Sequence, residues 1–330
     1  MTAVAADPLL LLVAGLVIDA LFGDMPAIFR YVPHPVVLAG RAIAFFDRKL
    51  NREARSEASR RERGVVTVVV LVCGAALLGL IIERACRGSL IGPVVEAVLI
   101  AVLVAQRSLY DHVAAVASAL ATGGLAGGRE AVRHIVGRDP TSLDAHGVAR
   151  AAIESLAENF SDGVVAPVFW YLLLGLPGLL AYKMANTLDS MIGHRTPHYR
   201  AFGWAAARLD DVLNTAPAPL SGVLLAVAAV FAKNARPGHA AAIMLRDGRK
   251  HHSPNAGWPE SAMAGALGLA LAGPRRYPEG LVADPWLGDG SARAGVSDIA
   301  RGLQLYRLAC FLEAGLLVGA WLAMHATLLA

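Results

Sequence analysis

The sequence has few charged residues. Asp, Glu, Lys and Arg make up 17% of its 330 residues, whereas soluble domains usually contain roughly 25%. Its three cysteines lie in or beside apolar runs without metal-site spacing, so we interpret them as small apolar residues. The net charge of +4 is modest, and no basic face is interleaved with aromatic residues, which argues against a nucleic-acid partner. A soluble fold is therefore the less favoured class.

Long apolar runs recur along the chain instead. A run of about 17 residues or more can span a hydrocarbon core, and Leu-, Ala- and Val-rich runs without period-two alternation predict helices, not strands. We therefore expect an all-α, polytopic integral membrane helical bundle with about five or six membrane segments, in one domain over residues 1–330. The apolar runs are 8–22, 65–82, 90–105, 164–182, 220–232 and 303–329, and the polar connections are 23–64, 106–163, 183–219 and 233–302.

The orientation of these segments follows from charge and from internal breaks. No Lys or Arg precedes Arg30 and no convincing cleavage site is seen, so we expect the first run to be a retained span. Basic residues crowd residues 48–63, which favours the cytoplasmic side of the inner membrane for that connection. The run 164–182 contains Gly175 and Pro177 and predicts either a kinked span or a re-entrant hairpin. We expect the functional site to face the cytoplasm.

One polar segment precedes this broken run. Asp139 and Pro140 are suited to the N-cap and first position of a helix that we expect to run to about Asn159. On that helix Glu154 and Glu158 share one side with an arginine. Two carboxylates one turn apart can hold Mg²⁺ or take a proton, although a solvated Arg–Glu pair is the simpler interpretation.

A second polar segment follows it. Helical spacing places Lys183, Asn186 and Asp189 on one arc of a helix that ends at Gly193. His194 and Arg195 come next as cations for a phosphate, and Arg208 starts another polar stretch. That stretch puts oxygen ligands of the type that Mg²⁺ prefers on one arc, unless they only cap the helix end: Asp210, Asp211 and Asn214.

A third polar segment lies at residues 246–261. Five basic or His residues precede Ser253 and Asn255, and Pro259 suits the first turn of a helix through 262–272. A helix N-terminus near so many cations favours an anion. The alternative is a surface loop with Trp258 buried in it.

Taken in order, four strings closely resemble the CbiB family of cobalamin biosynthesis, the adenosylcobinamide-phosphate synthases. They are AIESLAEN at 152–159 followed by Asp162-Gly163, KMANTLDSMIG at 183–193, RLDD at 208–211 and SPNAGWPE at 253–260. The match also takes in Asp19, Gly23-Asp24, His34-Pro35-Val36 and Gly40. The likeness covers nearly the whole chain, although 48–63 and 274–300 carry little of it.

This resemblance implies a multi-pass membrane ligase that joins the propionate carboxylate of a corrinoid, adenosylcobyric acid, to the amine of aminopropanol or aminopropanol phosphate. It implies Mg²⁺ and ATP, although the sequence shows no nucleotide-binding motif, and it also implies partners among other cobalamin-assembly enzymes. Assigning roles on that basis, we predict catalytic residues (Glu154, Glu158, Lys183, Asp189), substrate- or phosphate-binding residues (Asn159, Asn186, His194, Arg195, Arg208, Ser253, Asn255, Trp258, Glu260) and metal ligands (Asp210, Asp211, Asn214).

Two other functions fit parts of the pattern. A membrane prenyltransferase also places Asp and Asn on helices around Mg²⁺-diphosphate, and the two pairs Asn186/Asp189 and Asp211/Asn214 imitate this loosely. A transporter would explain the spans, the broken run and isolated charges such as Glu96 and Glu313. The polar residues cluster in connections more than in spans, which argues against transport.

Overall fold

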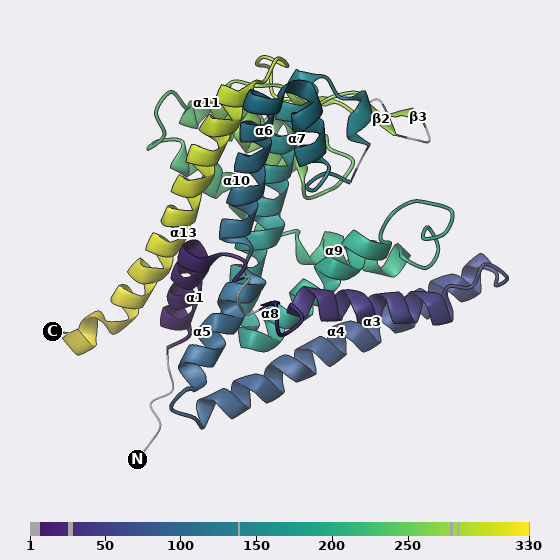
Figure 1. The fold of residues 1–330 in the computed structure, drawn as a ribbon. Helices are drawn as coiled ribbons and strands as arrows, with labels where there is room; N and C mark the ends of the chain where they lie inside the picture. Colours follow the sequence, from purple (N-terminus) through teal and green to yellow (C-terminus); the bar gives the residue numbers. More distant parts are fainter. Residues whose placement is uncertain (1–6, 26–28, 138, 278–279, 283, 330) are drawn as a thin grey trace. The chain divides into compact units, whose positions relative to one another are not determined.

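The structure is a computed structural model that describes residues 7–25, 29–137, 139–277, 280–282 and 284–329. It confirms the all-α prediction. Short strands occur in one region, where β1 (Leu271–Ala272) pairs with β4 (Trp286–Leu287) and β2 (Arg275–Tyr277) with β3 (Gly280–Val282), both antiparallel. The α-helices shown in Figure 1 are α1 (Pro8–Phe22), α3 (Pro35–Leu50), α4 (Glu57–Arg87), α5 (Gly92–Leu103), α6 (Gln106–Val132), α7 (Ala145–Phe160), α8 (Ala166–Ile192), α9 (Trp204–Leu213), α10 (Pro217–Ala228), α11 (Pro237–Asp247), α12 (Gly257–Leu267) and α13 (Val296–Leu329).

Four helical stretches of the described chain are long and apolar enough to cross a membrane: Glu57–Arg87, Gly92–Val132, Ala145–Ile192 and Val296–Ala326. A fifth is reached if α9 and α10 are counted as one broken span. The count of four or five overlaps the expected five or six at five; α1, at 15 residues, is short for a span, and α10 has 12. We assign α9 to the polar connection because three of its ten residues are charged.

Two helix boundaries differ from the prediction. Asp139 caps a short 3₁₀ helix, η1 (Pro140–Ser142), and α7 begins later because the Asp144 side chain accepts a hydrogen bond from the Gly147 amide at 2.6 Å. The helix expected to have Pro259 in its first turn and to run through 262–272 begins at Gly257 but ends earlier, at Leu267. Pro259 does lie in its first turn, and Gly268 stops the helix in a left-handed conformation, with φ of 70°.

Contacts group the chain into two compact units, which are described separately. The first comprises Met1–Ala105, Ala166–Asn214 and Leu317–Ala330, and the second comprises Gln106–Val165 and Thr215–Leu316. The prediction of a single domain over residues 1–330 stays a prediction.

In the first unit, α4 packs tightly along α8. A Cβ atom on Gly79 of α4 would lie 2.7 Å from the Pro177 Cα of α8, so only glycine permits this approach. Pro177 and Gly175, which has a φ of 65°, break α8 internally as the sequence predicts. Ile43, Val68 and Phe202 belong to a buried apolar cluster that joins α3, α4 and α8.

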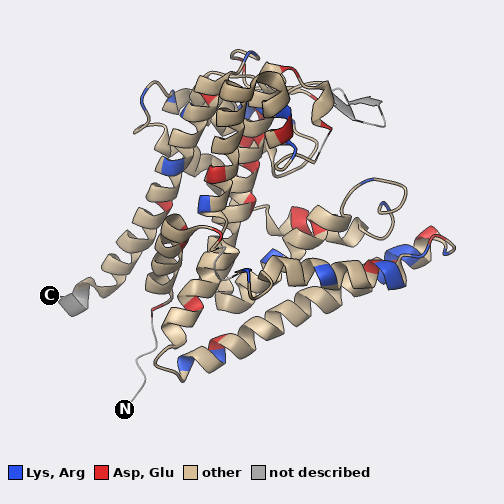
Figure 2. Cartoon of the chain, viewed as in Figure 1, with Lys and Arg blue, Asp and Glu red and all other residues tan. Residues whose placement is uncertain are grey.

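The basic stretch at 48–63 forms the corner between α3 and α4. Figure 2 shows charged residues of both signs gathered there. Arg60 is buried and donates to the Asn51 side chain at 2.7 Å and to the His198 carbonyl, while Arg61 lies 3.7 Å from the centre of the Trp204 ring. Arg60 and Arg61 therefore hold the segment 198–204 against the corner, Arg60 from a buried position and Arg61 from an exposed one.

In the second unit, α12 is the central element. Nearly every residue of this helix is buried, and it contacts α7, α10 and α11. Between α7 and α8 the chain forms a π-helix, η2 (Ser161–Val165). Short π-helical turns often occur at functional sites, and this one directly follows the predicted polar helix end.

Candidate functional site

The predicted residues on α7 differ in burial. Glu154 is buried, with 5% of its surface exposed, and its Oε1 accepts a hydrogen bond of 2.9 Å from the Ala272 amide in β1. Ala272 has a positive φ of 56°, so this bond holds a strained residue in place. Glu158 and Asn159 are exposed in the last turn of α7, and Asn159 donates to the Ser155 carbonyl at 2.9 Å. Glu158 therefore lies at the exposed end of the helix, whereas Glu154 is held inside the fold.

The loop from α11 to α12 brings its polar residues together around a histidine. His251 is buried, its Nδ1 accepts the Ser253 amide at 3.1 Å, and its Nε2 lies 3.9 Å from the buried carboxylate of Glu260. The Ser253 hydroxyl in turn accepts the amides of Asn255 and Ala256, each at 3.3 Å. These bonds fix the loop that enters α12.

The remaining predicted residues of this loop differ in position. Asn255 is buried, and the half-buried Trp258 lies under Arg249, whose guanidinium is 5.7 Å from the ring centre. The indole therefore offers a cation–π partner on the loop.

An acidic residue that the sequence reasoning missed organises the cations of this loop. The fully buried Asp247 accepts two hydrogen bonds from Arg246, at 2.8 and 2.7 Å, one from Lys250 at 2.6 Å and one from the Gly288 amide at 2.9 Å. Arg246 and Lys250 hold the pKa of Asp247 well below its usual value. Arg246 also pairs with Asp289 at 3.0 Å. The signal available in the sequence was a lone acid inside a basic segment.

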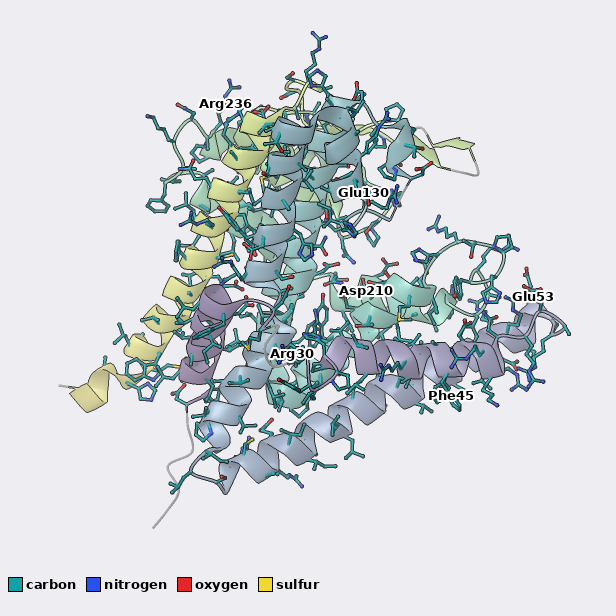
Figure 3. The ribbon with its side chains drawn as sticks, in the orientation of Figure 1. Arg30, Phe45, Glu53, Glu130, Asp210 and Arg236 are labelled. Carbon is teal, nitrogen blue, oxygen red and sulfur yellow. The ribbon has the colours of Figure 1, made fainter. Side chains whose placement is uncertain are left out.

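In the first unit, α8 and α9 build a buried polar cluster around Asp210 (Figure 3). Asp210 Oδ1 accepts from Asn186 Nδ2 at 3.3 Å, and Oδ2 accepts from Asn214 Nδ2 at 3.0 Å. Asn214 is fully buried, and its Oδ1 accepts the Tyr182 hydroxyl at 3.0 Å. The structure thus joins three predicted residues and adds Tyr182, which the sequence reasoning placed in the apolar run.

The Asp210 carboxyl has an unusual proton affinity. Burial, followed by the negative charge of Asp189 on α8, raises its pKa to about 7, and the two amide donors oppose the shift only in part. Carboxyl groups tuned toward neutral pH are typical of functional sites, although structural networks also produce them. This group can exchange a proton near physiological pH.

Lys183 lies near the start of α3. Burial lowers the pKa of His34, the N-cap of α3, and the positive charge of Lys183 lowers it further, whereas Asp24 acts in the opposite direction. His34 Nδ1 accepts the Val36 amide at 3.2 Å. A lysine close to a capped helix N-terminus is a favourable place for a phosphate.

The other predicted cations of this unit lie at its surface. His194 and Arg195 are exposed in the turn after α8. Arg208 pairs with Asp211 at 3.2 Å across one turn of α9, and its side chain is 61% exposed. Such an exposed pair contributes little stability, so a ligand phosphate can replace Asp211 as the partner of Arg208.

The predicted site residues therefore fall into both units. Glu154, Glu158, Asn159, Ser253, Asn255, Trp258 and Glu260 belong to the second, and Lys183, Asn186, Asp189, His194, Arg195, Arg208, Asp210, Asp211 and Asn214 to the first. Their assembly into one site, and their roles, stay predictions. Among the residues that the structure describes, no group of three or more His, Cys, Asp or Glu side chains could hold a metal ion.

The fold and the two polar clusters define a multi-pass helical membrane protein with polar chemistry in the connections between apolar helices. Comparison with known proteins then identifies it more closely. The sequence model of the family described as CobD/Cbib protein matches residues 12–306. The chain belongs to this family, whose curated relatives are cobalamin-biosynthesis proteins.

Several curated relatives are similar over almost their whole length. A protein named "Cobalamin biosynthesis protein CobD" from Sinorhizobium sp is 53% identical over 311 residues, covering 93% of this chain and 96% of its own. The protein of the same name from Rhizobium meliloti is 51% identical, covering 93% and 94%. The one from Rhodobacter capsulatus is 46% identical, covering 91% and 93%. No solved structure matches this chain.

Proposed function

We propose that this protein acts in cobalamin biosynthesis as an amide-forming ligase. It would join the propionate carboxylate of adenosylcobyric acid to the amine of aminopropanol or its phosphate, at a cytoplasm-facing site of the inner membrane, and it would act beside other cobalamin-assembly enzymes. The observation that carries the proposal is the family match over residues 12–306, which contains all four motifs and both polar clusters.

Amide formation from a carboxylate and an amine requires a few specific groups in the site. A free carboxylate is a poor acyl donor and must be activated, and the attacking amine must lose a proton. Bound Mg²⁺ and ATP would supply the activating phosphoryl group. The protein must then provide cations for phosphate, a base for the amine and donors for the developing oxyanion.

The cluster around Asp210 supports this proposal. Its carboxyl has a pKa of about 7, which suits a group that takes a proton from an ammonium nucleophile at neutral pH. Lys183, beside the start of α3, is suited to hold a phosphate. Asn186 and Asn214 would orient Asp210 through the hydrogen bonds already present.

The residues predicted as metal ligands fit Mg²⁺ only in part. Both polar atoms of the Asn214 amide are engaged, one by Asp210 and the other by Tyr182, so we propose a positioning role for it. Asp189 and Asp210 repel each other, and a cation would relieve that repulsion. Carboxylate oxygens are also the ligands that Mg²⁺ prefers, so Asp189 is the residue that would hold it, while Asp210 keeps its role as proton acceptor.

The test is direct ligation by detergent-purified protein. Adenosylcobyric acid, Mg-ATP and either aminopropanol or its phosphate are incubated with the chain, and the amide product is sought by mass. Omission of ATP should abolish the product, and the preferred amine identifies the natural partner. Absence of product, with all substrates shown to bind, would overturn the proposal.

Two variants separate catalytic from structural residues. Lys183→Ala should lower the rate at least tenfold while the protein elutes normally from a sizing column, and Glu158→Gln should do the same if the exposed acid of α7 takes part. Ser190→Ala is the matched control, because Ser190 is exposed on the same helix as Lys183 and its hydroxyl donates to the Asn186 carbonyl. A folded Lys183→Ala or Glu158→Gln variant with full activity would remove that residue from the site.

A further inference from the structure

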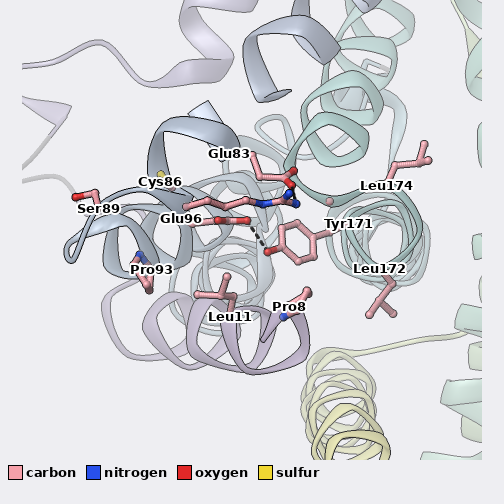
Figure 4. Close-up of a pocket in the computed structure, with 12 residues that line it drawn as sticks. Pro8, Leu11, Glu83, Cys86, Ser89, Pro93, Glu96, Tyr171, Leu172 and Leu174 are labelled. Atoms are coloured by element: carbon pink, nitrogen blue, oxygen red, sulfur yellow. Dashed lines mark hydrogen bonds and ion pairs between the residues drawn. The ribbon is translucent and has the colours of Figure 1, made fainter. Parts of the chain in front are cut away.

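The first unit contains a cavity that the proposed ligation does not use. It has a volume of about 280 Å³ and lies among α1, α4, α5 and α8. Figure 4 shows Glu83, Glu96 and Tyr171 around it, with Leu11 and Leu172 on its apolar sides. None of these residues is assigned to the ligation above.

The polar wall of the cavity is built from three helices. Glu83 on α4 is buried and pairs with Arg87, and Glu96 on α5 is buried and accepts the Tyr171 hydroxyl of α8 at 2.7 Å. Two carboxylates face one guanidinium, so the lining carries an excess negative charge when both acids are ionised. Carboxylates on membrane helices are costly, and they commonly mark binding sites or conduction paths.

The break in α8 is part of this wall. Gly175 lines the cavity with a φ of 65°, and a Cβ atom there would lie 2.6 Å from Glu83 Oε2. Only glycine both adopts this conformation and leaves room for the Glu83 carboxylate. The break that the sequence predicted as a kink thus also shapes the site.

We propose that this cavity binds a small ligand with a primary ammonium group. An ammonium supplies positive charge and several N–H donors to acceptor-only carboxylates, whereas a quaternary ammonium would need aromatic faces. The Arg87 guanidinium repels any cation in the cavity, but it repels a divalent metal ion twice as strongly as a singly charged ammonium at the same distance. At roughly 30 Å³ per water molecule, the volume of about 280 Å³ equals that of about nine waters, so it suits an occupant of up to about nine heavy atoms.

Two sources can supply such a group. One is a free short amine from the aqueous phase. The other is the ethanolamine head group of a phospholipid, since the lining residues Leu172 and Leu174 are exposed on a membrane-spanning helix, at 45% and 59%. The ammonium chemistry is the same in both cases.

The first experiment measures binding of labelled ethanolamine to the detergent-purified full chain without corrinoid or nucleotide. Saturable binding is expected, with choline at least tenfold weaker. Repeating the measurement in phosphatidylethanolamine and in phosphatidylcholine nanodiscs distinguishes the sources. If phosphatidylethanolamine nanodiscs lower ethanolamine binding and phosphatidylcholine nanodiscs do not, the lipid head group is the occupant. If ethanolamine binds equally in the two kinds of nanodisc, the free amine is the occupant.

Variants locate the binding. Glu96→Gln keeps the side-chain shape and removes one charge, so ethanolamine should bind at least tenfold more weakly. Glu313→Gln is the matched control, because Glu313 is equally buried, at 6% exposure, but does not line the cavity. If Glu96→Gln fails to fold, Glu83→Gln and Tyr171→Phe replace it, with weaker binding again expected.

The outcomes that overturn the proposal are clear. They are absence of saturable ethanolamine binding, equal binding of choline, or unchanged binding in folded Glu96→Gln and Glu83→Gln variants. The ligation assay is run on the same variants with saturating amine. If the cavity proposal fails, formation of the amide product is still expected, so failure of the cavity proposal can be distinguished from failure of the proposed ligation.

Discussion

Asp210 gives the sharpest test of the polar cluster in the first unit. In the folded chain its pKa is about 7, against an ordinary value of 3.8. Between these values the folded protein binds one proton more than the unfolded chain, so the free energy of unfolding must fall as pH rises. About three pH units at 1.36 kcal/mol each give a loss of about 4 kcal/mol that is complete above pH 7.

Replacing Asp210 with Asn removes this titration. The amide has only one oxygen, so one of the donors from Asn186 and Asn214 loses its acceptor, at a cost of about 1–3 kcal/mol at every pH. That cost shifts the variant's plot of unfolding free energy against pH by the same amount at every pH, whereas removal of the titrating carboxyl changes the slope of the plot. The difference in slope is therefore the quantity to measure.

The assay is thermal unfolding of detergent-purified protein from pH 5 to pH 8. Relative to Asp210→Asn, the natural chain should lose about 2–3 kcal/mol over this range, or about 5 °C in melting temperature. Asp211→Asn, which removes the neighbouring carboxylate on the same helix, is the control; because Asp211 makes the smallest contribution to the raised pKa of Asp210, its curve should keep most of the natural slope. Added Mg²⁺ should flatten the natural curve, because a metal ion competes with the proton. Parallel curves for the natural chain and Asp210→Asn would refute the reasoning.

Three further predictions concern stability. Gly64→Ala should prevent normal folding, since its Cβ would lie 1.9 Å from the Phe202 carbonyl oxygen. Gly74→Ala on the same helix meets nothing within 4 Å and should be neutral or slightly stabilising, and the monodisperse yield on a sizing column distinguishes the two variants. Asp247→Asn should lower the free energy of unfolding by about 3 kcal/mol at pH 7, because two cations lose a buried charged partner. This loss should shrink as the pH falls toward the depressed pKa of Asp247, which melting temperatures measured against pH would show. An unchanged melting temperature at pH 7 would contradict the prediction. Glu154→Ala should cost about 1–3 kcal/mol and loosen β1, seen as faster amide exchange there, whereas Glu154→Gln, which keeps an acceptor oxygen, should stay close to the natural protein.

Several features could be predicted from sequence because their causes are local. The break in α8 follows from Gly175 and Pro177, whose backbone preferences act wherever they lie in the chain. The end of α8 at Ile192, just before Gly193, was predicted in the same way. Boundaries set by competing caps were less predictable: Asp139 and Asp144 can both cap a helix, and the sequence does not say which one starts α7.

The roles within each polar cluster depend on packing. Glu154 and Glu158 are equivalent as a sequence pattern, yet one is buried under β1 and the other exposed, because the neighbour that covers Glu154 lies more than a hundred residues away in the chain. Asp247 looked like an ordinary surface acid among cations, and its burial appears only once Gly288 is placed against it. Short-range pattern cannot supply such long-range partners.

The sequence by itself determined the class of the protein. Its apolar runs, scarce charges and four ordered motifs were sufficient for a helical membrane protein of the cobalamin-biosynthesis family, because hydrophobic length and motif order are properties of the chain alone. The tertiary structure decided which charges are buried and paired. Packing raises the pKa of Asp210 by burying its carboxyl near Asp189, and packing also forms the cavity lined by Glu83 and Glu96. Both effects need the tertiary structure, because desolvation and charge proximity arise only when separate helices pack together.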